Sequence, residues 1–240
     1  MFFIMPMLPI LAVYILAAVL PAIILLRYIY KHDTVEKEPP GLLMLLLFMG
    51  VLAALCATVL EAVFQTVLDL LVDPGSPTYT ILLAFLVVAV VEEGTKLFFL
   101  KRRSWNSPAF NYRFDGVVYA VFVSLGFAAF ENIKYVLSYG LSVAVPRALL
   151  AVPGHMGFAV FMGAFYGRAR LRFNRGDETG GAVNMAAGYL IAVFLHGFYD
   201  TCAMLGTSAA TAAFVVFVVV MYIVVIRLIR RESLEDQPLY

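Results

Sequence analysis

Charged residues are scarce in this 240-residue sequence: Asp, Glu, Lys and Arg make up 14% of it, against 63% hydrophobic residues. A soluble domain is usually about 45–50% apolar, so this chain has too little polar surface to cover a globule in water. The formal net charge is only +1, which gives no bulk attraction to nucleic acid. The composition therefore excludes an ordinary soluble domain and a nucleic-acid partner, and it indicates a lipid bilayer as the surroundings.

Cysteine is equally rare. Cys56 and Cys202 both lie within apolar runs, which predicts small packed thiols rather than a disulfide or a cysteine–metal framework. The sequence contains no internal repeat or low-complexity tract. The N-terminal run Met1–Leu26 is too long for the apolar core of a signal peptide and lacks a basic start, so we expect a retained span. A single integral membrane domain over residues 1–240 follows from these absences.

Long apolar runs dominate what is present. Crossing the hydrocarbon core takes about 20 apolar residues in a helix, and on this count we expect an all-α, polytopic fold with about seven transmembrane helices. The last ten residues, Arg231–Tyr240, are expected to form a short polar tail. The expected spans are about Ile4–Leu26, Leu42–Val72, Tyr79–Leu100, Val117–Ser138, Pro146–Tyr166, Ala182–Leu205 and Ala209–Ile229.

Basic residues occur on alternate loops. Of the 17 Lys and Arg residues, 14 fall after the first, third and fifth spans or near the C-terminus, and none falls in the intervening loops Asp73–Thr78 and Gly206–Ser208. Cytoplasmic loops carry an excess of Lys and Arg. We therefore predict that the N-terminus faces outward and that the C-terminus is cytoplasmic.

The third span contains three charged residues, Glu92, Glu93 and Lys96. Charged side chains inside a bilayer are costly and tend to mark function. Two adjacent carboxylates in a low-dielectric site favour sharing of one proton, and Glu92 and Lys96 lie four residues apart on one helix face. A buried structural ion pair explains one Glu and the Lys but leaves the second Glu unexplained. The pair therefore favours general acid–base chemistry on a water molecule.

Other spans carry further polar residues. Glu131 and Asn132 lie deep in the fourth span, with Lys134 three residues on as a structural partner that would neutralise Glu131. Glu61 and Gln65 lie four apart in the second span, where they either line a cavity or satisfy a buried partner. Taken alone, these residues do not distinguish structure from function.

Histidine appears three times. His32 lies in a loop and is expected to be solvated. His155 lies inside the fifth span just after Pro153, which should interrupt the helix, and His196 in the sixth span has Asp200 four residues on. A lone membrane histidine is more often a packing residue, but two of them beside three deep carboxylates favour a base or a zinc ligand. Asp200 would then orient His196.

Depth in the bilayer gives a partial check. At about 1.5 Å rise per residue, His155 and His196 lie about 14 Å below the outer surface, and the Glu92–Glu93 pair is mismatched with them by about 10 Å. Arg147, near the outer start of the fifth span, either caps a cavity or extends to the interface.

Together these residues resemble the motif set of the PrsW family of bacterial intramembrane proteases, which is similar to the wider group of type II CAAX prenyl proteases and abortive-infection proteins. The prenyl proteases typically carry His where this chain has Glu131, and Asn or a similar residue where it has Asp200, so PrsW is favoured. The matching motifs are Glu92-Glu93-x-x-Lys96, Asp115-Gly116, Phe127-x-x-x-Glu131-Asn132, Arg147 with Pro153-Gly154-His155, and His196-Gly197-x-Tyr199-Asp200.

The resemblance implies site-1 cleavage of a membrane-anchored anti-sigma factor in the bacterial cytoplasmic membrane, as part of a stress response. It implies a site formed by Glu92, Glu93, Glu131, His155 and His196. The family is described both as metalloproteases and as metal-free glutamate proteases.

We therefore predict an intramembrane endopeptidase in which Glu92 or Glu93 activates water. His155 and His196 would either bind Zn²⁺ together with Glu131 or act with Asn132 on the scissile carbonyl. Either route requires a polar cavity that admits water. The rival interpretations are a proton-coupled transporter, which usually shows inverted repeats and paired broken helices, and a non-catalytic immunity or scaffold protein. No repeat is present, and only the fifth span is expected to be broken.

Overall fold

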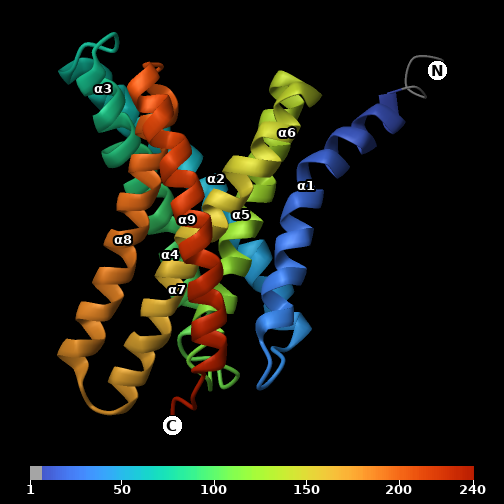
Figure 1. Cartoon of the computed structure of the whole chain (residues 1–240), viewed down its shortest axis with the longest axis vertical. Helices are drawn as coiled ribbons and strands as arrows, with labels where there is room; N and C mark the ends of the chain where they lie inside the picture. Colours follow the sequence, from blue (N-terminus) through green and yellow to red (C-terminus); the bar gives the residue numbers. More distant parts are fainter. Residues whose placement is uncertain (1–6) are drawn as a thin grey trace.

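The apolar runs fold into long helices that lie side by side, as Figure 1 shows. The computed structural model describes residues 7–240. In chain order the elements are α1 (Met7–His32), α2 (Pro40–Leu71), α3 (Pro77–Leu82), the π-helix η1 (Leu83–Ala89), α4 (Val90–Ser104), α5 (Asp115–Tyr139), the 3₁₀ turn η2 (Leu141–Val143), α6 (Ala144–Pro146), the π-helix η3 (Arg147–Ala151), α7 (Val152–Asn174), α8 (Glu178–Met204) and α9 (Ser208–Leu234).

Six helices among the described residues are long and apolar enough to cross a membrane. The remaining expected span is also helical, because α3, η1 and α4 continue without a break from residue 77 to residue 104. Its apolar character is interrupted by Glu92, Glu93 and Lys96. The expected all-α, multi-pass fold is confirmed.

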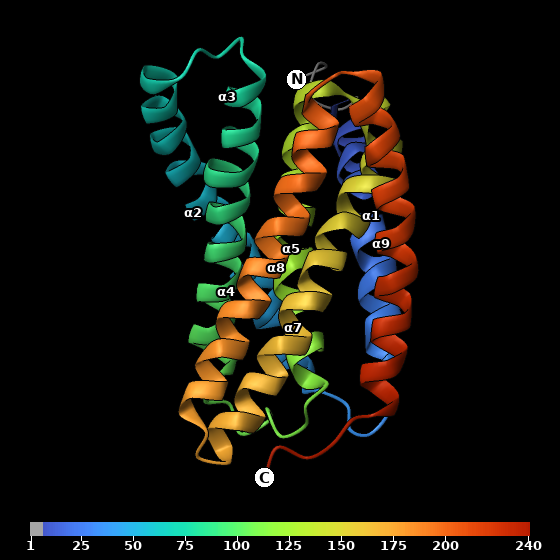
Figure 2. The same cartoon turned by 60° about the vertical axis from the view of Figure 1, so that its left-hand side comes forward.

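The helix ends differ from the expected spans mainly at one end of the bundle. α1, α7 and α9 run on to His32, Asn174 and Leu234, several residues past the apolar runs, and all three extensions lie at the end that carries the C-terminus (Figure 2). The extra turns hold basic residues, whose long side chains can reach the polar interface while the helix continues. Residues 4–6 of the first expected span lie outside the described residues.

Helix α5 forms the centre of the bundle, and its residues 117–128 are all buried. It crosses α2 where glycines allow the backbones to touch: a Cβ on Gly50 would lie 2.0 Å from the Val123 carbonyl oxygen, and one on Gly126 would lie 2.2 Å from that of Leu47. Small residues at such crossings are typical of membrane helices. Beyond this crossing α2 and α5 diverge toward the α2–α3 turn (Figures 1 and 2).

The short polar tail that follows α9 packs against the rest of the protein. The Leu239 amide donates to the Asn111 carbonyl at 2.8 Å, and the Arg113 amide donates to the Gln237 carbonyl at 3.0 Å. The Leu239 side chain is buried. These contacts join the chain end to the loop between α4 and α5.

A buried carboxyl group lies at the same end of the bundle. Glu38 precedes α2, is buried, and accepts a hydrogen bond from the Tyr119 hydroxyl. Burial raises the pKa of Glu38 to about 7, and the nearby Asp33 and Glu36 carboxylates add to the rise, whereas hydrogen bonds from Tyr119 and with Asp115 oppose it. The loop between α1 and α2 therefore depends on a carboxyl group that titrates near neutral pH.

Candidate active site

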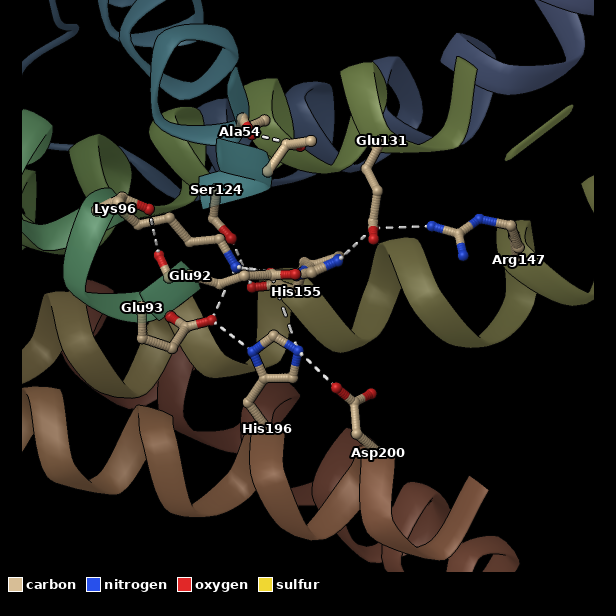
Figure 3. Close-up of polar contacts among 12 residues, drawn as sticks. Ala54, Glu92, Glu93, Lys96, Ser124, Glu131, Arg147, His155, His196 and Asp200 are labelled. Carbon is tan, nitrogen blue, oxygen red and sulfur yellow. Dashed lines mark hydrogen bonds and ion pairs between the residues drawn. The ribbon is translucent and has the colours of Figure 1, made fainter. Parts of the chain in front are cut away.

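Four helices bring the predicted site residues together, as Figure 3 shows. The glutamate pair lies on α4, Glu131 on α5, His155 on α7, and His196 on α8. The π-helix η1 directly precedes α4, and η3 directly precedes α7. The irregularity expected in the fifth span is therefore confirmed, and the third span contains a second π-helical segment that was not expected. Turns of this kind are frequent at functional sites.

Lys96 forms the buried centre of the site. Its Nζ donates to Glu92 Oε2 at 3.0 Å and to Glu93 Oε1 at 2.8 Å, and it lies 3.1 Å from His155 Nδ1. Three acceptors match the three N–H groups of an ammonium. The same Nζ lies 4.1 Å from the centre of the Phe127 ring. The predicted Glu92–Lys96 pair is thus present and extends to both Glu93 and His155.

His196 is held between two carboxylates. Its Nδ1 lies 2.9 Å from Glu93 Oε1 and its Nε2 lies 3.3 Å from Asp200 Oδ2, so the expected contact between His196 and Asp200 is confirmed. The ring stacks on Phe158 with a centroid separation of 4.8 Å. These contacts fix the orientation of the imidazole, which is the usual role of a carboxylate behind a functional histidine.

Glu131 is paired with Arg147 and not with Lys134, so the expected structural pair was wrong. Arg147 Nη2 donates to Glu131 Oε2 at 2.8 Å, and the same oxygen lies 3.1 Å from His155 Nε2. The guanidinium also covers the Tyr135 ring at 3.8 Å. Lys134 is exposed and makes no ion pair with Glu131. Sequence spacing could not identify a partner that comes from another span.

Asn132 is fully buried, and both of its polar atoms are engaged. Its Nδ2 donates to the Ala18 carbonyl of α1 at 2.7 Å, and its Oδ1 accepts from Arg147 Nε at 2.7 Å. The side chain therefore holds Arg147 and α1 in place and does not line the cavity described below. Ser124, which the sequence did not suggest, donates to the His155 carbonyl at 2.9 Å.

A polar cavity of about 490 Å³ opens beside these groups. Glu92, Glu131, His155 and His196 line it, whereas Glu93 is 0% exposed and lies behind them. The cavity extends to Met204 at the end of α8, toward the end of the bundle opposite the C-terminus (Figure 2). The expected route for water is therefore present.

The expected depth mismatch of the glutamate pair is absent. Glu92, Glu93, His155 and His196 each offer a ligand atom, and these atoms all lie within 4.8 Å of one another. Two nitrogens and two carboxylate oxygens suit zinc. The expected ligand set named Glu131 together with the histidines, but in the grouping that the structure shows, the glutamate pair takes its place.

Two further observations test whether a metal fits. One is the buried Glu93 Oε2, which has no hydrogen-bond partner among the described residues. The other is charge, because two negative charges remain when both histidines are neutral, and a buried excess of this kind is costly unless it is compensated. The residues fit a divalent cation in type and charge, although Lys96 already occupies one face of both carboxylates. The four negative groups in this count are Glu92, Glu93, Glu131 and Asp200, and the two positive groups are Lys96 and Arg147.

Comparison with known proteins identifies the family of the chain. Residues 38–228 match the family described as PrsW family intramembrane metalloprotease. Protease PrsW of Geobacillus kaustophilus is 34% identical over 184 residues, covering 77% of this chain and 76% of that protein. Protease PrsW of Bacillus subtilis is 32% identical over 184 residues, with 77% and 79% covered. Protease PrsW of Halalkalibacterium halodurans is 29% identical over 221 residues, with 92% and 97% covered.

No solved structure matches the chain. The family match spans α2 to α9 and includes every residue of the buried cluster. It supports a protease and gives no support to the transporter or scaffold interpretations. The chain belongs to the PrsW family of intramembrane proteases.

Proposed function

We propose that the chain hydrolyses a peptide bond in a single-span membrane protein, with Glu92 as the general base. The observation that supports this assignment is the difference between the two adjacent glutamates. Glu92 lines the cavity, where water and a peptide can reach it. Glu93 faces the interior, and one of its oxygens accepts from both Lys96 and His196. Glu93 is thus a positioning residue for the cation and the imidazole.

The chemistry follows from these positions. Glu92 accepts a proton from a water molecule, whose oxygen forms a bond to the scissile carbonyl carbon. His196 lines the cavity, and its Nε2–H, which lies 3.3 Å from Asp200 Oδ2, would shift its hydrogen bond from Asp200 to the oxygen that becomes negative. Glu92 then passes the proton to the leaving nitrogen as the C–N bond breaks. The products are a carboxylate and an amine.

A zinc ion, when bound, would polarise the carbonyl as a Lewis acid. With Glu92 serving as the base, the residues that would hold the ion are Glu93, His155 and His196. Two histidines and one glutamate are an established ligand set for a catalytic zinc that keeps one position open. Glu131 is less suited to this role because it lies outside the group of converging ligand atoms, and its Oε2 is already engaged by Arg147 and His155.

We further propose that the substrate is an anti-sigma factor anchored in the bacterial cytoplasmic membrane. The support for this is the resemblance of the motifs to the PrsW family and the cavity that opens away from the C-terminus. If the C-terminus is cytoplasmic, cleavage falls in the outer half of the membrane.

The test is co-expression with candidate single-span anti-sigma factors, following the appearance of a truncated product. Glu92→Gln should lower cleavage by about 10²–10⁴-fold, since Gln keeps the size but cannot accept the proton. Glu178→Gln, on the exposed first turn of α8, is the matched control and should cleave normally. Both variants need wild-type expression and thermal stability. Wild-type cleavage by a stable Glu92→Gln variant would rule out the proposed base.

A further inference from the structure

Glu61 is a buried polar group that the proposed mechanism does not use. It lies in the part of α2 beyond the crossing with α5, where nearly every residue from Val59 to Leu71 is exposed to the membrane. Glu61 is half-buried, and its Oε1 is buried without a hydrogen-bond partner among the described residues. A carboxylate oxygen left unpaired in hydrocarbon is costly, so its presence needs an explanation.

The position of Glu61 links the gap between α2 and α5 to the active site. It lines the large cavity together with Glu92 and Lys134. The same three residues also line a small cavity of about 20 Å³ between α2 and α5, along with Thr58. Such a volume holds about one water molecule. The gap therefore leads to the proposed base, but it is narrow where α2 and α5 are still close.

Lys134 faces Glu61 across this gap, since both residues line the two cavities from different helices. Lys134 is exposed and makes no hydrogen bond or ion pair with other residues in 7–240. Glu61 on α2 is thus a hydrogen-bond acceptor and Lys134 on α5 a hydrogen-bond donor on opposite sides of the gap. Neither group has a partner in the described part of the chain.

The chemistry of the reaction supplies a ligand for both groups. A transmembrane helix must unwind locally before its backbone can be hydrolysed, and each N–H and C=O released in hydrocarbon costs several kcal/mol. A carboxylate can accept from such an N–H, and an ammonium can donate to such a C=O. An extended chain presents both kinds of group along its length.

We propose that Glu61 and Lys134 bind the unwound backbone of the substrate where it passes between α2 and α5 toward Glu92. The inference rests on the proposed peptidase function. It makes the two residues substrate-binding residues, and it assigns the gap between α2 and α5 as the route of the substrate from the membrane.

The experiment measures KM and kcat for a single-span reporter in proteoliposomes. Glu61→Leu and Lys134→Met should each raise KM by about tenfold, which is about 1.4 kcal/mol, close to the lower end of the usual range for a hydrogen bond to a charged group. kcat should stay within about twofold of wild type, because binding that is equal in the ground and transition states affects KM alone. Glu61→Gln keeps an acceptor oxygen and should fall in between.

Two readouts distinguish this role from a structural one. Removing a charge from the membrane should leave thermal stability unchanged or raised, whereas loss of a structural ion pair would lower it. The matched control is Thr66→Leu, because Thr66 lies on the same exposed part of α2 and donates only to the Ala62 carbonyl. An unchanged KM in Glu61→Leu, or a loss of activity that parallels a loss of stability, would overturn the proposal.

A crosslinking experiment tests the route itself. In the Glu92→Gln background, a photoreactive residue at position 58, which lines the small cavity together with Glu61, should crosslink to the substrate, whereas one at Val63 faces the opposite side of α2 from Glu61 and should not. Equal crosslinking from both positions would overturn the route. If Glu92→Gln cleaves normally, the proposed function itself is wrong. If Glu92→Gln is inactive while Glu61→Leu has a wild-type KM, only the present inference is wrong.

Discussion

Replacement of Lys96 by Met tests whether the Lys96 ammonium offsets the free-energy cost of burying the two adjacent carboxylates of Glu92 and Glu93. Lys96 Nζ contacts Glu92 Oε2 at 3.0 Å and Glu93 Oε1 at 2.8 Å, and the lysine side chain is 2% exposed. Met has a similar length and no charge, so the change removes the cation without opening a large cavity. Both carboxylates would then lose their nearest positive charge within the protein.

The magnitude follows from the burial of the pair. Removing one partner of a buried ion pair usually costs about 3–5 kcal/mol, because the other charge stays desolvated and unpaired. We expect Lys96→Met to lower the free energy of unfolding by about this amount. Removing both partners of a pair is often close to neutral, so the double variant Lys96→Met/Glu93→Gln should recover the part of the loss that comes from Glu93, whereas Glu92 still lacks its cation. The coupling between the two changes should exceed about 2 kcal/mol, as for residues in one network.

The assay is unfolding in detergent micelles, with refolding checked so that free energies are defined. Single and double variants form a complete double-mutant cycle with wild type and Glu93→Gln. Cleavage of a reporter substrate, measured in parallel, should be lost in Lys96→Met because His155 Nδ1 and both carboxylates lose their common donor. A Lys96→Met protein as stable as wild type, with no coupling to Glu93→Gln, would refute the electrostatic argument.

Three further predictions follow from other parts of the molecule. Reporter fusions after Val72 and after Leu205 should report the outside and a fusion after Leu100 the cytoplasm; a cytoplasmic signal after Val72 would contradict the seven-span topology. Elemental analysis of purified protein should find about one zinc per chain, and exhaustive chelation should abolish cleavage; full activity without metal would favour the metal-free route. Because the pKa of Glu38 is raised to about 7 from 4.5 in the folded protein, the contribution of Glu38 to stability should be fully present below about pH 4 and be lost as the pH rises through 7, a change on the order of 3 kcal/mol. Glu38→Gln should flatten this pH dependence, and an unchanged slope would show that another group is responsible.

Much of the fold could be predicted from the sequence because apolar length and charge position are local properties. The runs of apolar residues gave the helices, and the basic residues marked one end of the bundle. The ends of α1, α7 and α9 could not be placed in this way. Their last turns are polar, so the apolar run ends before the helix does. The backbone hydrogen bonds of the helix continue into these polar turns. The packing of Leu239 could not be predicted from the sequence either, because it depends on a loop more than 100 residues away in sequence.

The site was predictable only where partners lie on one helix. The Glu92–Lys96 pair and the His196–Asp200 contact follow from spacing of four residues. The partner of Glu131 does not, since the nearby Lys134 was the obvious candidate on spacing and the actual partner, Arg147, comes from another span. Partners on other helices depend on tilt and rotation, which a single sequence does not encode locally.

The two π-helical segments account for a small part of the misplaced depth of the glutamate pair, because both lie on stretches over which depth was counted. A π turn holds more residues than an α turn, so a regular helix drawn through it misjudges both the height and the direction of the residues that follow. η1 ends three residues before Glu92, and η3 ends four residues before His155. The helical stretches that lead to Glu92 and to His155 therefore each contain an irregular turn just before the site. The irregular turns also let side chains from α4 and α7 meet at Lys96 Nζ, 3.1 Å from His155 Nδ1, which makes the two segments part of what positions the proposed base.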